Sequence, residues 1–415
     1  MILFHADTDK LELLYILRSL ESGNLLDKIL VICSQNFAKE YNPNIPNLII
    51  DDFSDMQVLV TRIKDWMNEK IVSLDWIVPS DDDEGFLVTR ALSEGLGIPT
   101  YPKPTLLASS NKFVMKKCFE KNNVPICNYK LINSPEDAKL FSFPNVMKMI
   151  VGGQSVLMFK NETYFDLEKN FSVAISEIKR QGLKSNISEW SGISLDAGKQ
   201  MLVEEFMAGE EFSCDFVVLD GQITVLRVIH KIPSAETGYF LAYHLMNNSS
   251  IDKFFKIEKL KSICKNIADS FSLNAGVCMV DFMLVGKEIL VIESSVRPGF
   301  STFLYIMLDL YGYTSWKILM GLLLGEKSLP EIPDIEGLIY YIWAPASGTI
   351  TKFDCLISSE IELMKFIQFD KVGDSIIDSP DHHYNRNLGL ILIRNPKDIY
   401  STIDRINKSI IIEMK

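Results

Sequence analysis

The chain has 415 residues, of which 47% are hydrophobic and 23% are charged, and its formal net charge is −12. That length predicts two to four packed units, and the composition excludes the disordered class of proteins. The acidic balance, without any run of basic residues, argues against a nucleic-acid-binding protein, which presents a basic face.

The cysteines and the apolar segments indicate the compartment. Seven cysteines occur without a CxxC pair or the spacing of a metal site, which predicts reduced thiols. The N-terminus, MILFHADTD, lacks the basic and apolar regions of a signal peptide. The most apolar segment, Phe303–Gly325, contains Asp309 and Lys317, which favours a buried helix over a membrane span. We therefore expect a cytoplasmic protein that binds neither nucleic acid nor membrane.

Residues 1 to about 105 alternate short apolar runs with amphipathic stretches. This alternation predicts a Rossmann-like parallel sheet with helices on both faces. Gly97 and the prolines that follow it mark the end of this unit. Strands are predicted at Met1–Ala6, Ile29–Cys33, Leu48–Ile50 and Trp76–Val78, and helices at Leu11–Leu20, Met56–Asn68 and Gly85–Leu96.

The middle of the chain has the pattern of an antiparallel sheet with helices. Asp220-Gly221 and Gly286-Lys287 each predict a two-residue hairpin turn. A helix is predicted at Ser110–Glu120, and strands at Val146–Ile150, Met201–Phe206, Ser213–Leu219, Ile223–Ile229, Val277–Val285 and Glu288–Glu293. After Pro330, strands are predicted near Gly337–Trp343 and Leu388–Ile393, and a helix near Pro396–Ser409.

Two acids, Asp281 and Glu293, lie within the apolar strands of the second hairpin and could face each other. Neighbouring carboxylates repel and need a cation, and Mg²⁺ takes such ligands together with nucleotide phosphates. Solvated acids at strand ends are the ordinary alternative. An unpaired carboxylate inside an apolar strand is costly, however, which favours a metal. Arg297 follows four residues later, where it suits either a transferred phosphoryl group or a surface ion pair.

Two further stretches are weaker signals. Lys148 precedes Gly152-Gly153, where a lysine and backbone N–H groups could hold phosphate oxygens, although ordinary hairpin loops carry the same residues. The strand and loop Leu202–Glu211 could offer backbone groups to adenine and an acid to ribose, but alone it is better interpreted as an acidic loop. Neither GxxxxGK[ST] nor GxGxxG occurs, so a Walker-type NTPase or a dinucleotide-binding protein lacks its central motif. No histidine matches the spacing of a zinc site.

The order of these features resembles the ATP-grasp superfamily, in which two β-rich lobes hold ATP between them. Most similar are the bacterial L-amino acid ligases. The stretch VIHKIPSAETGYFLAYH resembles their H-x-K loop, VIESSVRPG resembles their I-E-S-x-x-R segment, and the tail from Trp343 resembles their C-terminal subdomain.

The resemblance implies the fold and its division. It implies an ATP-grasp fold of the α/β and α+β class, with an N-terminal Rossmann-like domain and a C-terminal α+β subdomain. The expected ranges are 1–105 for the first domain, 106–330 for the ATP-grasp core and 331–415 for the subdomain. Within the core, a small lid lobe spans about 140–203 and a large lobe spans 204–330.

The resemblance also implies roles for single residues. Asp281 and Glu293 would hold Mg²⁺, with Mn²⁺ as an option. Arg297 would bind the acyl phosphate, with His244 near the substrates. ATP would meet Lys112 and Lys148 at its phosphates, Gly153 and Ser155 in the covering loop, Glu204, Glu205, Phe206 and Met207 at the adenine, and Glu211 at the ribose.

The chain departs from the superfamily pattern K-P-x-x-G-x-G-S-x-G in its glycine loop. Met149 replaces the proline, Gln154 the second loop glycine and Leu157 the last one, which puts closure of the loop in question. Ser295 stands where many members have an asparagine, which implies a weaker second Mg²⁺ site.

The implied reaction is ATP-dependent ligation of a small carboxylate to an amine, both expected to be amino acids, through an acyl phosphate; a homodimer is left open. Aromatic residues near the expected acid pocket (Thr237–His244 and Phe300–Tyr305) hint at an apolar or aromatic substrate. A carboxylase or carbamoyl-phosphate-type activator is disfavoured because no biotin- or glutamine-handling domain is visible. A nucleotide-binding regulator without catalysis stays open because of the imperfect glycine loop. A dehydrogenase would rest on the N-terminal domain alone.

Overall fold

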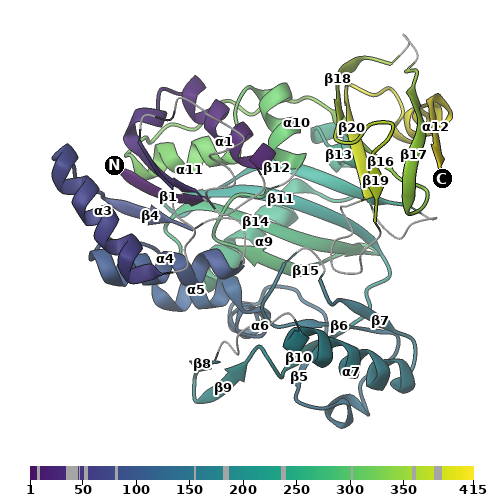
Figure 1. Cartoon of the computed structure of the whole chain (residues 1–415). Helices are drawn as coiled ribbons and strands as arrows, with labels where there is room; N and C mark the ends of the chain where they lie inside the picture. The colour runs from purple at the N-terminus through teal and green to yellow at the C-terminus, as the bar shows by residue number, and fades with distance from the viewer. Residues whose placement is uncertain are drawn as a thin grey trace.

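The structure is a computed structural model that describes residues 1–6, 10–33, 45, 47–50, 55–79, 83–153, 156–180, 187–234, 240–300, 302–357, 361–377 and 386–415. A small parallel sheet lies at one end of the molecule and the C-terminal strands lie at the other, with a long antiparallel sheet between them (Figure 1). A separate four-stranded sheet projects from one side, below the long sheet in Figure 1.

The N-terminal unit has the predicted α/β architecture. Its sheet has the order β3-β2-β1-β4 with all pairs parallel. Helix α3 begins at Met56 because the Asp55 side chain accepts the N–H groups of Gln57 and Val58. The strands are β1 (Ile2–Ala6), β2 (Ile29–Cys33), β3 (Leu48–Ile50) and β4 (Trp76–Val78); the helices are α1 (Lys10–Ser22), the 3₁₀ turn η1 (Leu26–Lys28), α3 (Met56–Lys70) and α4 (Asp83–Leu96).

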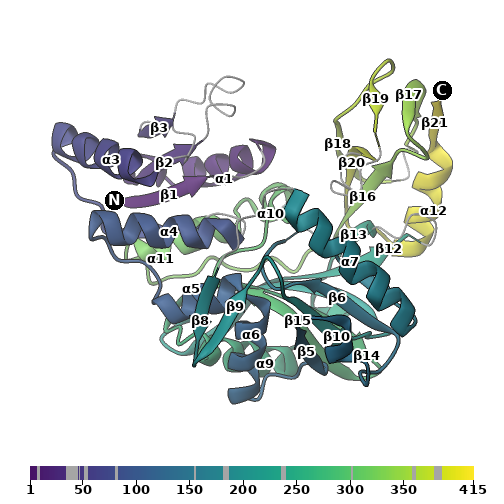
Figure 2. The ribbon, with the colours of Figure 1, turned by 60° about the horizontal axis from the view of Figure 1, so that its bottom comes forward.

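A second sheet, whose strands lie between residues 129 and 205 and which we call the lid lobe, has its own small core (Figure 2). It has the order β5-β10-β6-β7, and α7 packs on it. Two helices lead into it, and the Asn111 side chain caps the second of them. The elements are α5 (Lys103–Ser110), α6 (Lys112–Lys121), β5 (Tyr129–Ile132), η2 (Pro135–Ala138), β6 (Asn145–Met149), β7 (Phe159–Asn161), α7 (Tyr164–Arg180), the hairpin β8 (Ile187–Trp190) and β9 (Ile193–Asp196), and β10 (Met201–Glu205).

The long sheet has eight antiparallel strands in the order β15-β14-β11-β12-β13-β16-β20-β18. Asp220 and Gly221 have φ of 51° and 75°, as the predicted hairpin turn requires. Strand β13 pairs with β16, so the sheet continues across the domain boundary expected near residue 330. The strands are β11 (Glu210–Leu219), β12 (Gln222–Pro233), β13 (Phe240–Leu245), β14 (Ala275–Val285), β15 (Glu288–Ser295), β16 (Gly337–Trp343), β18 (Leu363–Gln368) and β20 (Asn387–Arg394).

Each face of the long sheet is covered by helices. One face packs on α6 and α9 (Ile257–Ser270), close to the short helix α8 (Asn248–Ile251). The other packs on α1, α10 (Thr302–Tyr311) and α11 (Ser315–Leu323). The segment Phe303–Gly325, expected to form one buried helix, forms these last two, because Gly312 has φ of 75° and Thr314 caps a new helix.

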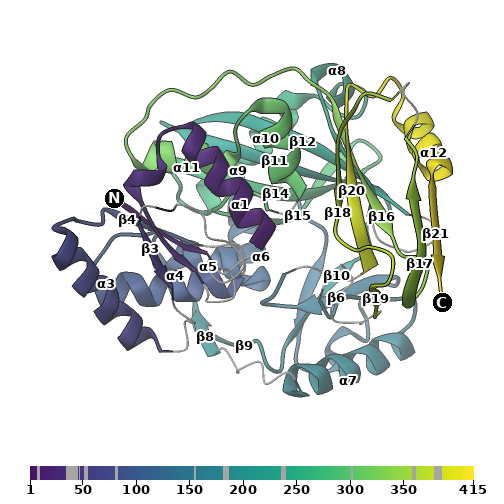
Figure 3. The same cartoon turned by 45° about the horizontal axis from the view of Figure 1, so that its top comes forward.

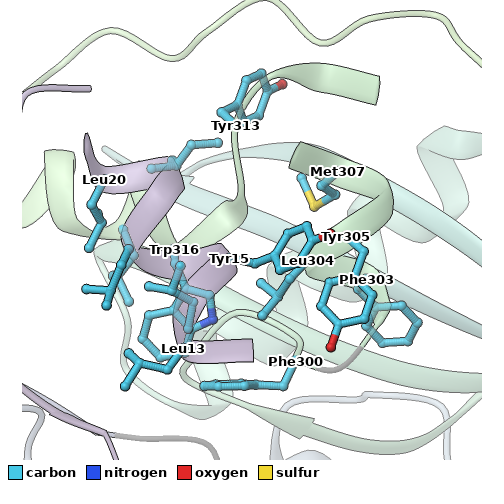
Figure 4. Packing of buried hydrophobic residues seen from close by; sticks show 14 of the residues in the cluster. Leu13, Tyr15, Leu20, Phe300, Phe303, Leu304, Tyr305, Met307, Tyr313 and Trp316 are labelled. Carbon is cyan, nitrogen blue, oxygen red and sulfur yellow. The ribbon is translucent and has the colours of Figure 1, made fainter. Parts of the chain in front are cut away.

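The N-terminal helix α1 joins the first unit to the long sheet. Figure 4 shows its residues Leu13, Tyr15 and Leu20 beside α10 and α11, where the Tyr15 and Tyr305 rings lie 4.3 Å apart. Lys365 of β18 donates a 2.6 Å hydrogen bond to the Tyr15 hydroxyl and pairs with Asp309 of α10 at 3.4 Å. Tyr15 therefore contacts both the helices that cover the long sheet and the C-terminal strand β18.

The C-terminal segment adds a three-stranded sheet of order β19-β17-β21 and helix α12 (Figure 3). Its elements are β17 (Gly348–Cys355), β19 (Ser375–Ile376), α12 (Ile399–Ser409) and β21 (Ile410–Met414). Strands β5, β7, β8, β9, β13, β17, β18, β19 and β21 were not predicted. Among the described residues, no helix has both the length and the apolar character needed to span a membrane.

Candidate active site

Three carboxylates lie on one face of the long sheet, at the end nearest the lid lobe. Asp281 pairs directly with Glu293 across the hairpin, as predicted, and with Ser213 on its other side. Glu211 lies two residues from Ser213 along β11 and therefore on the same face. Asp281 is buried, and its Oδ1 atom has no hydrogen-bond partner among the described residues. The acids are concentrated enough to require a cation.

Lys231 of β12 supplies a positive charge to two of these acids. Its Nζ atom lies 2.7 Å from Glu211 Oε1 and 2.7 Å from Asp281 Oδ2. Burial opposes its charge, but Asp281 and Glu211 outweigh that effect and raise the pKa of Lys231 above its ordinary value. Burial also raises the pKa of Glu211, against the attraction of Lys231. Lys231 was not among the predicted site residues.

A second buried ion cluster links the lid lobe to helix α6. Glu204 of β10 lies 2.7 Å from Lys148 Nζ of β6 and 2.9 Å from Lys116 Nζ of α6. Burial favours the neutral acid, but the two lysines outweigh it and lower the pKa of Glu204 to about 2. Burial likewise opposes the charge of Lys148, and Glu204 and Glu293 together raise its pKa above the ordinary value. Glu293 is thus close enough to Lys148 for its charge to act on the lysine.

The glycine loop of the lid contacts the start of α6. The Lys112 ammonium donates a short hydrogen bond to the Gly152 carbonyl, and the Lys112 N–H donates to the Ile150 carbonyl at 2.8 Å. Gly152 has φ of 121°, a conformation that favours glycine, and Gly153 has open space around it. Ser155 and Gln154 lie outside the described residues. Lys112 and Gly153, both expected near phosphate, thus lie in one loop region.

A cavity of about 390 Å³ lies at the hinge between the lid lobe and the long sheet. The hinge is fixed by backbone and side chain alike: Glu205 N–H donates to the Asn128 carbonyl, and Asn128 Nδ2 donates to Glu205 Oε2, each at 2.9 Å. Its volume and mostly apolar walls suit a flat heterocycle such as a purine. The cavity is lined by Ile126, Cys127, Asn128, Glu205, Phe206, Met207, Ala208, Val285 and Leu290.

Of the four residues expected at the adenine, three line this cavity. Glu205, Phe206 and Met207 do so, whereas the Glu204 carboxylate points into the ion cluster with Lys116 and Lys148. The prediction of an adenine contact for Glu204 is therefore not supported by its geometry. The alternation of a strand explains the difference, because neighbouring residues point to opposite faces.

Arg297 lies in the turn that follows β15. Its Nη1 atom donates to the Pro298 carbonyl at 3.0 Å, and its guanidinium carbon lies 5.4 Å from the centre of the Phe300 ring. Asp215 of β11 stabilises the turn, because its Oδ1 accepts the Gly299 N–H at 3.0 Å. Arg227 of β12 pairs with the same oxygen at 2.7 Å.

His244 of β13 lies on the other face of the long sheet. It pairs with His230 across β12 and β13, whereas Lys231 pairs with Tyr243. Since neighbouring residues of a strand alternate, His244 and His230 lie on the face opposite Asp281. There His230 stacks on Phe212 at 4.7 Å, and His244 Nε2 lies 3.4 Å from Glu336. His244 therefore does not lie beside the carboxylates, and its expected place near the substrates stays a prediction.

The residues that the sequence analysis missed share one signal. Lys231, Arg227 and Asp215 are charged residues inside apolar strands, and Lys116 lies in an apolar helix segment. The same criterion singled out Asp281 and Glu293. Applied to the whole chain, it would have found the other four, because a buried charge needs a partner.

The acids fit a divalent cation. Among the described residues no group of three or more histidine, cysteine or acidic side chains is arranged for a metal ion. Two carboxylates are nevertheless sufficient for Mg²⁺ that is also held by nucleotide phosphates. The unpartnered Oδ1 of Asp281 supplies a buried oxygen ligand of the type that Mg²⁺ takes.

Part of the chain is similar to a known domain family. Residues 141–299 match the family of ATP-grasp domains. The L-arginine-specific L-amino acid ligase of Bacillus subtilis is 20% identical over 314 residues, which are 74% of this chain and 71% of that protein.

Two crystal structures are similar over the full length of the chain. The L-amino acid ligase of Bacillus licheniformis aligns with 100% of this chain and 98% of its own at a TM-score of 0.78 and 18% identity. The biotin carboxylase of Campylobacter jejuni, in complex with β,γ-ATP, aligns with 100% and 92% at a TM-score of 0.66 and 15% identity.

Proposed function

We propose that this chain, which has the ATP-grasp fold and matches the ATP-grasp domain family over residues 141–299, is an ATP-dependent carboxylate–amine ligase that joins amino acids. The proposal places it with the L-amino acid ligases that it resembles in sequence and fold. The expected domain limits at residues 105 and 330 remain part of this proposal.

One observation carries the proposal: Lys116 and Lys148 pair with Glu204, whose neighbour in β10, Glu205, lines the cavity that suits a purine. Asp281 and Glu293 face the same side of the long sheet, and the charge of Glu293 acts on Lys148 of the lid lobe. A nucleotide in the hinge cavity would direct its phosphates toward this border, where lysines neutralise them.

The nucleotide contacts are assigned on this basis. Glu205, Phe206 and Met207 would contact the adenine, and Glu211 the ribose. Lys112 and Lys148 would contact the phosphates, with Gly153 and Ser155 in the loop that covers them. Asp281 and Glu293 would hold Mg²⁺ or Mn²⁺, which neutralises phosphate charge when bound.

The chemistry has two steps. The carboxylate of one amino acid attacks the γ-phosphorus of ATP, which forms an acyl phosphate and breaks the bond to ADP. The amine of the second amino acid then attacks the acyl carbon, expels phosphate and loses a proton. Arg297 would stabilise the negative charge of the transferred group in both steps. Closure of the glycine loop would exclude water, which otherwise hydrolyses the acyl phosphate.

The test is phosphate release from ATP and Mg²⁺ across a panel of amino acid pairs, with bicarbonate as an additional acid. We expect release that needs one acid and one amine, and a dipeptide product by mass spectrometry. Arg297→Ala should lower release strongly but leave a measurable residual rate, whereas Arg90→Ala, a partly exposed arginine of the N-terminal unit, should leave release unchanged.

Other outcomes are equally informative. Release that needs bicarbonate and no amino acid would assign the protein to the carboxylases instead. Binding of ATP without release for any pair would contradict the ligase and favour the regulator. Failure to bind ATP would refute the proposal as a whole.

A further inference from the structure

A buried carboxylate holds the turn that carries Arg297. Asp215 Oδ1 accepts the N–H of Gly299 at 3.0 Å, and Gly299 lies two residues after Arg297. The other oxygen, Oδ2, accepts a hydrogen bond from the Ser315 hydroxyl at 2.7 Å, so Asp215 links the turn to helix α11. Asp215 is 1% exposed, so these bonds are shielded from water.

Arg227 neutralises this carboxylate and completes its surroundings. Its Nη2 atom lies 2.7 Å from Asp215 Oδ1 and 3.4 Å from Ser213 Oγ. Its guanidinium carbon lies 3.9 Å from the centre of the Phe303 ring. Among the described residues, its Nε and Nη1 atoms have no hydrogen-bond partner. Arg227 therefore stabilises the Asp215 carboxylate through its charge more than through hydrogen bonds.

The fit at Gly299 leaves no room for adjustment. A Cβ atom at this position would lie 2.2 Å from Arg227 Nη2 and 3.0 Å from Asp215 Oδ1. The backbone of the turn therefore lies directly on the ion pair. Any change in the pair is transmitted to the backbone two residues from the Arg297 side chain.

The pair also lies next to the metal-binding acids. Ser213, which Arg227 contacts, is the direct cross-strand neighbour of Asp281. Asp215 is two residues further along β11 and shares its face. One face of the sheet thus supports both the acids and the turn that carries Arg297.

We propose that Asp215 is a positioning residue that, with Arg227 as its counter-ion, fixes the Arg297 guanidinium relative to Asp281 and Glu293. This inference rests on the role given to Arg297 in the proposed function. Asp215 acts through Arg297 and does not touch the substrates. A displacement of Arg297 by about 1 Å would reduce turnover about 100-fold, since phosphoryl transfer depends on placement.

The test is a double-mutant cycle between Asp215→Asn and Arg297→Ala, measured as kcat and KM for ATP. We expect Asp215→Asn alone to lower kcat about 100-fold with little change in KM for ATP. In the Arg297→Ala background the same substitution should lower kcat no further. Additive losses, or a wild-type kcat for Asp215→Asn, would overturn the inference.

Two matched variants separate positioning from folding. Ser315→Ala removes a hydrogen bond from the same carboxylate but keeps its charge and its bond to Gly299, so it should lower kcat far less than Asp215→Asn does. If Asp215→Asn does not fold, Asp215→Asn/Arg227→Gln removes both charges and avoids an uncompensated one. This double variant should fold and still show the loss of kcat; full activity would contradict the inference.

Hydrogen exchange provides a readout that needs no activity. The peptide spanning residues 294–302 should exchange faster in Asp215→Asn than in the wild type or Ser315→Ala. Unchanged exchange would refute the inference whatever the reaction is. If the wild type releases no phosphate with any substrate but Asp215→Asn still exchanges faster, the ligase is refuted and the support of the turn by Asp215 stands.

Discussion

Lys231 donates a 2.7 Å hydrogen bond to Asp281 Oδ2, one of the two acids assigned to the metal. Because its pKa is raised, this lysine stays charged at every working pH. In the ligand-free protein its ammonium therefore neutralises the acid that a divalent cation also requires. Lys231 and the metal compete for Asp281 unless the lysine turns toward phosphate when both bind.

Replacement of Lys231 by methionine should expose this competition. The variant alone should lose about 3–5 kcal/mol of stability, because two buried carboxylic groups lose the cation between them. Mg²⁺ alone should then raise its melting temperature more than it raises that of the wild type. Lys259→Met, which removes a surface lysine bound to Glu288, is the control. Equal Mg²⁺ shifts in both variants would show that Lys231 does not compete with the metal.

Substitution of either acid assigned to the metal should have effects that substitution of another acid on the same hairpin does not. Asp281→Asn and Glu293→Gln should each lower kcat at least about 100-fold, because stabilisation of the transferred charge is lost. The Mg²⁺ concentration needed for half-maximal activity should also rise. Glu288→Gln on the same strand is exposed and should behave as wild type. An unchanged Mg²⁺ dependence in Asp281→Asn would remove this residue from the site.

Glu204 should make the stability of the protein depend on acid pH. Its pKa is about 2 in the folded protein, below the ordinary 4.5, so the folded state keeps the charge that the unfolded state loses. The contribution, about 3 kcal/mol, is present above pH 4.5 and is lost as the pH falls toward 2. Unfolding of Glu204→Gln in urea should show a flatter pH dependence over that range, whereas exposed Glu258→Gln should follow the wild type. Parallel curves for Glu204→Gln and the wild type would contradict this account.

Gly299→Ala should damage the protein by steric contact alone. Its new Cβ would lie 2.2 Å from Arg227 Nη2, and relief of such overpacking costs about 1–3 kcal/mol. Thermal unfolding should show this loss, together with a fall in kcat because the turn shifts. Gly153→Ala, where a Cβ meets nothing within 4 Å, should keep the wild-type melting temperature. A normal melting temperature for Gly299→Ala would mean that the turn adapts easily.

Much of the fold could be predicted from local patterns. The parallel strands Ile29–Cys33 and Trp76–Val78 are continuous apolar runs, and the Asp220-Gly221 turn is specified by two residues that adopt positive φ. Strand β18 escaped prediction because it lies at the sheet edge and is half exposed, without a regular apolar period. Helix α10 ends at Tyr311 because Gly312 adopts a positive φ. This end was not predictable, because tertiary packing decides whether a helix continues through a glycine.

Only the part of the candidate site that lies within one local element could be predicted from the sequence. Asp281 and Glu293 could be paired because one hairpin fixes their register. The position of His244 depends on which face of β13 turns toward the acids, and that strand was not predicted. The partners of Glu204 come from α6 and β6, which are far apart in the sequence. Contacts of this kind depend on tertiary packing, and local patterns do not contain them.

The contact of α1 with α10 and α11 also bears on how the chain is made. Tyr15 leaves the ribosome about 290 residues before Tyr305, its neighbour in the folded protein. At 5–20 residues per second, the apolar side of α1 waits roughly 15–60 s for its cover. During that time Leu13, Tyr15 and Leu20 form an uncovered apolar stripe on the nascent N-terminal unit, which is the kind of surface that chaperones bind.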